Sequence, residues 1–336
     1  MLIYVRLSGE HRTLPLAELR AVLEAEGVIF KEIIRADQVV VLEIPKNFLN
    51  VLMKRLSLTT SIGMVAGIYS RSSVKIREII NDLISILGKA TKVNFIYDRI
   101  KGRESLKYEE IRRELKRQGF KLSSKNYEKV IEIISSDLII SGVRLFRRSI
   151  HMYEDRAPQR RPIYRPGTLT PQVARLFVNL SRASRKNSPY VDPFCGVGGF
   201  LLEACVMGIN EYLGVEISDD YAIGAKINLL HYGCLPNVVV GDACNIPVDK
   251  AGAIGTDPPY GRMTGTIGRR LRDLMLCFLE ESAKILRKGS YLVFAQRRGV
   301  INEEDILKID GLELVEKHLN WVHGSLTRDI YVVRRY

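Results

Sequence analysis

The stretch Val191-Asp-Pro-Phe-Cys-Gly-Val-Gly-Gly-Phe200 predicts a short strand that runs through a glycine-rich loop into a helix. Glycine lets a backbone adopt positive φ angles and approach a ligand closely. The loop is not GxGxxG, so a dinucleotide pyrophosphate is a poorer candidate for its ligand. Asp192 stands at the predicted end of the strand, and a carboxylate there suits a cation such as the ammonium group of methionine.

Strand and helix patterns alternate along the chain from residue 190 onward. Strands are predicted over 190–191, 212–217, 237–240, 251–256 and 290–296, and helices over 200–207, 219–231 and 267–286. Such alternation indicates a parallel, doubly wound sheet. The tail differs, because 312–322 and 329–334 predict two antiparallel strands, joined by Gly324-Ser325, that close the sheet.

Acidic residues follow two further strands of this sheet. Glu216, in Gly214-Val-Glu-Ile-Ser218, stands where an acidic residue accepts hydrogen bonds from ribose hydroxyls. Asp242, in Val240-Gly-Asp-Ala-Cys-Asn-Ile-Pro247, is placed to accept an adenine amino group, with Ala243 as a backbone donor. Each carboxylate alone could simply face solvent. Three acidic strand ends in register indicate one binding crevice.

The most specific motif is Thr256-Asp-Pro-Pro-Tyr-Gly261. An amino group on a nucleobase is a weak nucleophile, because its lone pair is delocalised into the ring. The Asp257 carboxylate and the Pro258 carbonyl can accept its N–H groups and so shift electron density onto nitrogen. Neither Pro258 nor Pro259 has an N–H that would compete. Tyr260 offers a face on which a base can stack.

The basic charge of the chain is concentrated in its first half. The net charge is +13, of which residues 1–150 carry +10 and residues 151–336 carry +3. Residues 89–129 hold 13 basic and 6 acidic side chains, with Arg112-Arg113 and Lys116-Arg117 at i, i+4 on one predicted helix. Such cations repel each other unless phosphates or carboxylates neutralise them. A polyanion is the expected partner, and a merely solvated basic surface is the alternative.

Composition excludes several other classes of protein. No window approaches the roughly 18–20 apolar residues of a membrane helix, and the N-terminus does not have the pattern of a signal peptide. Five cysteines form no CxxC pair, and the five histidines show no ligand spacing. We therefore expect a cytoplasmic protein without a disulfide framework or a metal site.

The first half predicts two smaller units and a linker. Strands over 3–7 and 39–44 and a helix over 16–26 indicate an α+β unit in residues 1–50. Residues 51–150 carry predicted helices over 76–87 and 108–118 and strands over 93–97 and 138–146. Residues 151–170 contain prolines and arginines that favour an extended, polar linker. Thr170 is then expected to cap a helix that starts at Pro171.

These motifs, in this order and spacing, resemble those of class I methyltransferases that act on exocyclic amino groups. The first half resembles that of a THUMP-containing RNA methyltransferase. The stretches Arg161-Pro-Ile-Tyr-Arg-Pro-Gly-Thr-Leu169 and Val322-His-Gly-Ser-Leu-Thr-Arg-Asp-Ile-Tyr331 resemble the archaeal tRNA guanosine-10 N2-methyltransferases. One departure is Arg165, where that family is expected to have a ring such as histidine.

The resemblance implies a fold and a domain order. The fold class is α/β, with a class I, Rossmann-like methyltransferase domain that ends in an antiparallel strand. The implied domains are a ferredoxin-like domain (1–50), a THUMP RNA-binding domain (51–150), the linker (151–170) and the methyltransferase domain (171–336). The THUMP domain would bind the acceptor end of a tRNA.

The resemblance also implies an activity and its residues. Such enzymes transfer methyl groups from S-adenosylmethionine to N2 of guanosine 10 in tRNA, often twice, leave S-adenosylhomocysteine, and need no metal. The implied catalytic residues are Asp257, Pro258, Pro259 and Tyr260. The implied cofactor-binding residues are Asp192, Phe194, Cys195, Gly196, Gly198, Glu216, Ile217, Asp242, Ala243 and Asp257.

Several alternatives stay open at the level of sequence. A related activity methylates guanosine 6 of tRNA, and DNA amino-methyltransferases also use Asp-Pro-Pro-Tyr, although no large target-recognition insertion lies beside the motif here. A protein-glutamine methyltransferase would leave the basic first half unexplained. A non-enzymatic RNA-binding module would not need the acidic strand ends. The sequence does not specify mono- or dimethylation, the oligomeric state, or a small activator subunit.

Overall fold

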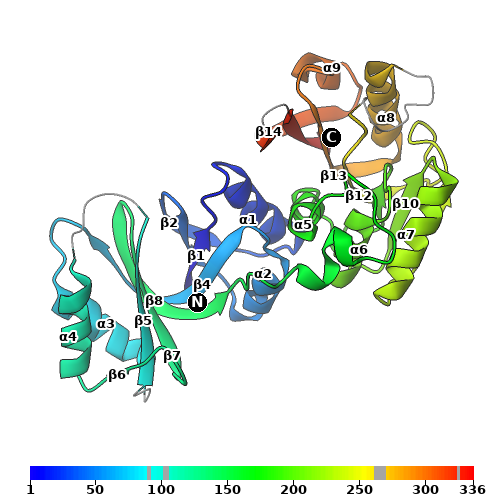
Figure 1. The fold of residues 1–336 in the computed structure, drawn as a ribbon. Helices are drawn as coiled ribbons and strands as arrows, with labels where there is room; N and C mark the ends of the chain where they lie inside the picture. The colour runs from blue at the N-terminus through cyan, green and yellow to red at the C-terminus, as the bar shows by residue number, and fades with distance from the viewer. Residues whose placement is uncertain (89–91, 101–105, 261–269, 324–325) are drawn as a thin grey trace. The chain divides into compact units, whose positions relative to one another are not determined.

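The computed structural model describes residues 1–88, 92–100, 106–260, 270–323 and 326–336. The chain forms two compact units (Figure 1). Unit 1 comprises Met1–Arg12, Val28–Met53 and Leu58–Ser149, and unit 2 comprises Thr13–Gly27, Lys54–Ser57 and Ile150–Tyr336.

Unit 1 is built on one eight-stranded sheet with the order β2-β3-β1-β4-β8-β7-β5-β6. Its strands are β1 (Leu2–Leu7), β2 (Lys31–Ala36), β3 (Val39–Glu43), β4 (Thr59–Ser70), β5 (Lys92–Arg99), β6 (Lys121–Leu122), β7 (Lys129–Ser135) and β8 (Leu138–Arg147). Strands from 1–50 and from 51–150 therefore share hydrogen bonds, because β1 pairs antiparallel with β4. A buried hydrogen bond from the Tyr4 hydroxyl to Glu132 Oε2, 2.7 Å long, joins the same two segments.

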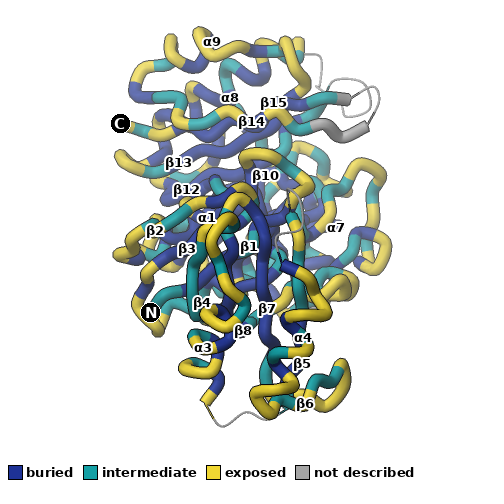
Figure 2. Tube along the Cα trace, turned by 90° about the vertical axis from the view of Figure 1, so that its left-hand side faces the viewer, coloured by how far each residue is buried: buried dark blue, intermediate teal, exposed yellow. Residues whose placement is uncertain are grey.

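Two amphipathic helices pack against the second half of this sheet. Helix α3 (Ile76–Leu87) buries Ile79, Ile80, Leu83 and Leu87, which recur on one helical face. Helix α4 (Tyr108–Arg117) buries Ile111 and Leu115 in the same apolar cluster. The polar faces of both helices stay exposed, whereas β1 and β7 are mostly buried (Figure 2). The short elements η1 (Lys46–Phe48) and α2 (Leu49–Arg55) precede β4.

Unit 2 is built on a seven-stranded sheet with the order β11-β10-β9-β12-β13-β15-β14. Its strands are β9 (Tyr190–Asp192), β10 (Tyr212–Glu216), β11 (Val238–Val240), β12 (Ala251–Thr256), β13 (Leu286–Arg297), β14 (Leu312–His323) and β15 (Leu326–Arg335). The first five are parallel, and β15 pairs antiparallel with both β13 and β14. This confirms the predicted parallel sheet and its antiparallel closing pair. The predicted Gly324-Ser325 connection lies outside the described residues.

Helix α5 (Pro171–Leu180) precedes the sheet of unit 2. Helices α6 (Gly199–Val206), α7 (Asp219–His231) and α8 (Leu271–Ile285) follow its strands β9, β10 and β12, and α9 (Glu303–Leu307) follows β13. Thr170 caps α5 as predicted, because its Oγ1 accepts the Val173 N–H. Residues 267–269 of the helix predicted over 267–286 lie outside the described ranges.

An N-terminal helix also belongs to unit 2. Helix α1 (Leu14–Ala25) places the buried Glu18 where its Oε1 accepts hydrogen bonds from Asn179 of α5, at 2.8 Å, and from Ser57. Arg55 donates to Asn179 Oδ1 and to the Ala183 carbonyl. These buried polar groups satisfy one another, which explains why two short segments of the first 60 residues belong to this unit.

The prediction that residues 151–170 form an extended, polar linker is wrong about the conformation of this segment. Two short 3-10 turns, η2 (Glu154–Arg156) and η3 (Pro158–Arg160), fold this segment. Arg156 and Arg161 are buried, and Asn228 of α7 exchanges hydrogen bonds of 2.9 Å with the backbone of Ile163. The prolines keep the segment free of longer helices and strands, as expected. Arg156 and Arg161, however, are buried against the protein, where an extended linker would leave them exposed to solvent.

The expectation of no disulfide is also wrong. The structure contains disulfides between Cys205 and Cys234 and between Cys244 and Cys277, and leaves Cys195 as a buried free thiol. The paired cysteines are 29 and 33 residues apart, so no local spacing indicates them. Among the described residues, no helix combines the length and apolarity needed to cross a bilayer.

Candidate active site

The candidate site lies at the carboxyl edge of the unit 2 sheet, where the strand order reverses. Strand β9 has β10 on one side and β12 on the other, so the connections leave this point in opposite directions. Ligands of open α/β sheets bind at such a switch point. The ends of β9, β10, β11 and β12 place Asp192, Glu216, Asp242 and Asp257 along this edge.

Asp192 is a fully buried carboxylate with one uncommitted oxygen. Its Oδ1 accepts the Thr256 hydroxyl at 2.6 Å and the Phe194 N–H at 3.3 Å. Its Oδ2 has no hydrogen-bond partner among the described residues. Burial raises the pKa of Asp192 to about 7, while the two hydrogen bonds to Oδ1 oppose the rise. A buried, unpaired acceptor favours a cationic donor at this position.

The glycine-rich loop that follows Asp192 leaves open space at Gly196. Gly196 has φ +50°, and a Cβ placed on it would meet nothing within 4 Å. Gly198 has φ +84° and lies against Ala225 of α7, where a Cβ would come within 3.2 Å of the alanine Cβ. Cys195 is buried, and its backbone N–H donates to the Val215 carbonyl at 3.0 Å. The loop is therefore held to β10 while its tip remains accessible.

Glu216 fixes the shape of that loop. Its Oε2 accepts the Gly196 N–H at 2.9 Å, and its Oε1 accepts the Ser218 N–H at 3.0 Å. Each carboxylate oxygen retains a lone pair for a further donor. The neighbouring Ile217 is 44% exposed, which leaves an apolar surface next to the carboxylate.

Asp242 closes the turn that follows β11. Its Oδ1 accepts the Cys244 N–H at 2.9 Å, and its carbonyl accepts the Asn245 N–H at 2.8 Å. Ala243 is buried in this turn. The carboxylate is therefore oriented by its own loop, at the far end of the row that begins with Asp257.

The Asp257–Tyr260 loop is tied together by its own side chains. The Tyr260 hydroxyl donates a short hydrogen bond to Asp257 Oδ1. Burial raises the pKa of Asp257, and the guanidinium of Arg328 is the main opposing influence. Pro258 is buried, Pro259 and Tyr260 are half-buried, and Gly261 lies outside the described residues. The predicted stacking face of Tyr260 is thus anchored at its hydroxyl end.

Comparison with known proteins agrees with this geometry. The family model described as "RMKL-like, methyltransferase domain" matches residues 158–330. The "tRNA (guanine(10)-N2)-dimethyltransferase" of Methanothermobacter thermautotrophicus is 31% identical over the full length of both chains. The chain belongs to this dimethyltransferase family. The resemblance of its sequence motifs to the family is thereby confirmed.

Solved structures share the fold of this family member. TrmN from Thermus thermophilus superposes with a TM-score of 0.58 at 17% identity, covering 100% of both chains. SMU.472, solved as a complex with SAH, gives 0.51 at 15% identity, covering 100% of this chain and 98% of the other. The predicted class I methyltransferase fold is confirmed.

Two arginines at the candidate site are not among the residues that the motifs predicted. Arg328 reaches the Asp257 loop from β15, 71 positions along the chain. Arg161 is buried, and its two terminal nitrogens lack partners in the part of the chain that the structure describes. One of them is 3.1 Å from where a Cβ on Gly199, the first residue of α6, would stand. Both arginines lie in the stretches whose resemblance to the family is noted above, which is the one signal that indicated them.

Proposed function

We propose that the protein transfers methyl groups from S-adenosylmethionine to N2 of guanosine 10 in tRNA, first one and then a second. The observation that carries the proposal is the Asp257 carboxylate, only 12% exposed, on an Asp-Pro-Pro-Tyr loop that follows the strand next to β9, where the unpaired Asp192 oxygen lies. Membership in a family whose relative bears this activity in its name supports the choice of base and position. A tRNA substrate places the enzyme in the cytoplasm.

The residues at the sheet edge fit S-adenosylmethionine. Asp192 Oδ2 would accept its ammonium group, and Arg161 with the N-terminus of α6 would meet its carboxylate. Glu216 would accept the ribose hydroxyls, and Ile217 would pack on the adenine. Asp242 and the Ala243 N–H would read the adenine edge. Phe194, Cys195, Gly196 and Gly198 would shape the loop around the methionine portion. The bound cofactor supplies an electrophilic methyl group on a sulfonium sulfur.

The Asp257 loop would activate the target amino group. The guanine must leave its stack, at a cost of about a few kcal/mol, and stacking on Tyr260 offsets on the order of 1–3 kcal/mol. The Asp257 carboxylate and the Pro258 carbonyl accept the N2–H groups and orient the nitrogen. Pro259 keeps that carbonyl fixed. The amino proton becomes acidic only after transfer, so Asp257 acts as an acceptor for developing positive charge and not as a strong base.

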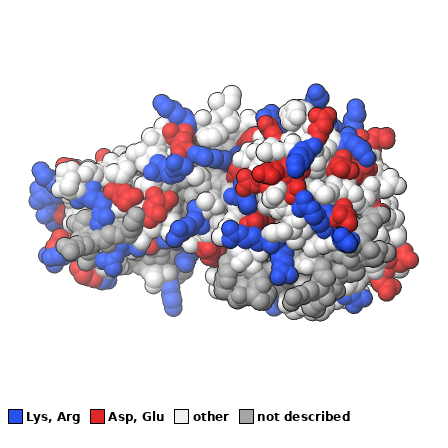
Figure 3. Space-filling model, turned by 90° about the horizontal axis from the view of Figure 1, so that it is seen from above, with Lys and Arg blue, Asp and Glu red and all other residues white. Residues whose placement is uncertain are grey.

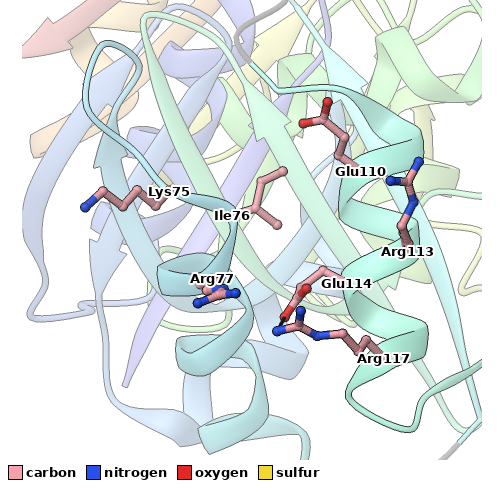
Figure 4. A pocket seen from close by; sticks show the side chains of 7 residues that line it. All are labelled: Lys75, Ile76, Arg77, Glu110, Arg113, Glu114 and Arg117. Carbon is pink, nitrogen blue, oxygen red and sulfur yellow. Dashed lines mark ion pairs between the residues drawn. The ribbon is translucent and has the colours of Figure 1, made fainter.

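The first half of the chain would bind the tRNA. We assign residues 1–50 to a ferredoxin-like domain, 51–150 to a THUMP domain, 151–170 to the linker and 171–336 to the methyltransferase domain. A groove between α3 and α4 is lined by four cations, two carboxylates and one apolar side chain: Lys75, Arg77, Arg113, Arg117, Glu110, Glu114 and Ile76 (Figure 4). Such a surface can hold backbone phosphates.

The charges of this groove differ in how far they are neutralised. Arg117 lies 3.2 Å from Glu114, so a carboxylate of the same helix neutralises it. Arg77 and Arg113 make no ion pair among the described residues, which leaves them available to phosphate. On the face that Figure 3 shows, Lys and Arg side chains are interspersed with Asp and Glu side chains.

Replacing the groove cations Arg77 and Arg113 should flatten the salt dependence of tRNA binding. For R77Q/R113Q we expect the slope of log Kd against log salt to fall by about 2, with weaker binding at low salt. Filter binding over a salt series measures it. The matched control R287Q/K288Q removes two exposed cations at the start of β13, the edge opposite the site, and should leave the slope unchanged. An unchanged slope in R77Q/R113Q would remove the groove from the proposal.

Binding of S-adenosylmethionine should weaken as the pH falls. Because burial raises the pKa of Asp192 to about 7, protonation below that pH removes the acceptor of the ammonium group. Kd should therefore rise by up to about tenfold per pH unit below 7. Calorimetry between pH 5.5 and 8 tests this. D192N should bind weakly with a flat profile, whereas E216Q should bind weakly and keep the dependence. A flat profile in the unmodified protein contradicts the assigned role.

The decisive experiment uses the purified chain, labelled S-adenosylmethionine and unmodified tRNA transcripts, followed by nucleoside analysis. A matched transcript lacks guanosine 10. N2-methylated and N2,N2-dimethylated guanosine that disappear with the replacement support the proposal. If the transcript without guanosine 10 is still methylated, the methylated position lies elsewhere in the tRNA, and guanosine 6 is the next position to replace. Transfer to duplex DNA alone overturns the proposal, and bound cofactor without transfer directs the search to an activator subunit.

A further inference from the structure

Arg328 of β15 is a buried cation in direct contact with the candidate catalytic loop. Its side chain is 4% exposed, and its Nη1 lies 3.4 Å from both carboxylate oxygens of Asp257. The same nitrogen donates to the Tyr260 hydroxyl at 3.1 Å. One guanidinium therefore contacts both polar side chains of the loop.

The antiparallel strand β15 places this cation near the Asp257 loop. In β12 and β13, Thr256 pairs with Phe294, and in β13 and β15, Arg297 pairs with Arg328. Arg328 consequently stands beyond the carboxyl end of β12, three residues past the level of Thr256, where the loop that begins with Asp257 lies. A parallel final strand would present its carboxyl end here instead.

The orientation of the guanidinium is fixed from two further sides. Asn320 stands opposite Arg328 in the β14–β15 pair, and its Oδ1 accepts the Nε–H at 2.9 Å. The ring of Phe177 in α5 lies beneath it, with the guanidinium carbon 5.7 Å from the ring centroid. Side chains of α5 and β14 thus hold the guanidinium in a fixed orientation toward Asp257.

We infer that Arg328 is a positioning residue for methyl transfer, which keeps the Asp257 carboxylate ionised and aimed at the target amino group. The inference rests on the proposed function. An ionised carboxylate accepts stronger hydrogen bonds than a neutral one, and burial without a cation favours the neutral form. Arg328 supplies that cation while leaving lone pairs of Asp257 for the base.

The charged groups around Asp257 decide what a pH profile would report. Among the described residues they are Arg328 from β15, Tyr260 from the loop itself, and Asp192 at the end of β9. Burial raises the pKa of Asp257, and Arg328 and the Tyr260 hydrogen bond lower it. Asp192 titrates through cofactor binding, so saturating S-adenosylmethionine removes its contribution from kcat. The acid limb of kcat then reports Asp257.

The test is the pH dependence of kcat for tRNA methylation in R328Q, R328K and the control R334Q. Arg334 is on the same strand, but it is 46% exposed and pairs with Glu313 at the surface. In R328Q, kcat should fall about 100-fold at neutral pH, and the acid limb should move up by about 1–3 pH units. R334Q should match the unmodified protein, and cofactor affinity should stay unchanged in all three.

The outcomes separate a positioning role from a structural one. A fall in kcat in R328Q without a displaced acid limb overturns the inference. If R328Q does not fold, R328K carries the test, because its charge should keep the acid limb within about half a pH unit of R334Q while kcat falls. A larger displacement in R328K overturns the inference as well. Absence of tRNA methylation by the unmodified protein would instead defeat the proposed function.

Discussion

D257A is expected to lower kcat for tRNA methylation by about 10³-fold while the Kd for S-adenosylmethionine changes little. Removing one preorganised group that stabilises transition-state charge costs about 10²–10³ in kcat. Asp257 has this role and also lies at the centre of a hydrogen-bond network, since Tyr260 and Arg328 both contact its carboxylate. Truncation also leaves Arg328 as an unpaired buried cation, which adds to the loss.

Single-turnover kinetics with saturating cofactor, together with calorimetric Kd values, separates the two effects. D249A is the matched control, because Asp249 is an exposed aspartate two residues before β12, at the opposite edge of the sheet. It should retain activity within about twofold, as expected for a surface change. E216Q should show the converse pattern, with a raised Kd and a nearly normal kcat. Equal losses of kcat and affinity in D257A would assign Asp257 to the cofactor instead.

The sheet edge of unit 2 was predictable because its signals are local. A strand that ends in an acidic residue and a glycine or proline turn can be read within ten residues, as at Asp192 and Asp257. The predicted bounds of α7 and β12 agree with the structure. The convergence of these ends on one edge then follows from parallel strand order alone.

The contacts that were missed depend on pairings distant in the sequence. Sequence patterning predicts no strand over Lys31–Ala36 or Thr59–Ser70, although β4 joins β1 to β8 in the sheet of unit 1. Arg328 is a charged residue in an alternating strand, a pattern that normally indicates a solvent-facing side chain. Its burial arises only because β15 lies between β13 and β14. Local periodicity carries no information on such neighbours.

A buried ion cluster of Glu203, Arg156 and Arg175, which joins the segment before α5 to α5 and α6, leads to the largest expected effect on stability. Glu203 of α6 is fully buried and accepts from Arg156 Nε and Arg175 Nε, each at 2.9 Å. Removing one member of a buried ion cluster costs about 3–5 kcal/mol, because the remaining charges stay desolvated. E203Q keeps the volume but offers a single acceptor oxygen to two arginines. We expect it to lower the free energy of unfolding by about 3–5 kcal/mol.

Urea denaturation followed by circular dichroism measures this loss, and E313Q is its control. Glu313 pairs with Arg334 at 3.5 Å, but both side chains are nearly half exposed, so the loss should be about 0–1 kcal/mol. A loss that small in E203Q would mean that water reaches the cluster. The triple variant R156M/R175M/E203M, which removes every charge, should be more stable than E203Q. If it is instead less stable, the cluster stabilises the fold through its backbone hydrogen bonds, such as that from Arg175 to the Lys54 carbonyl.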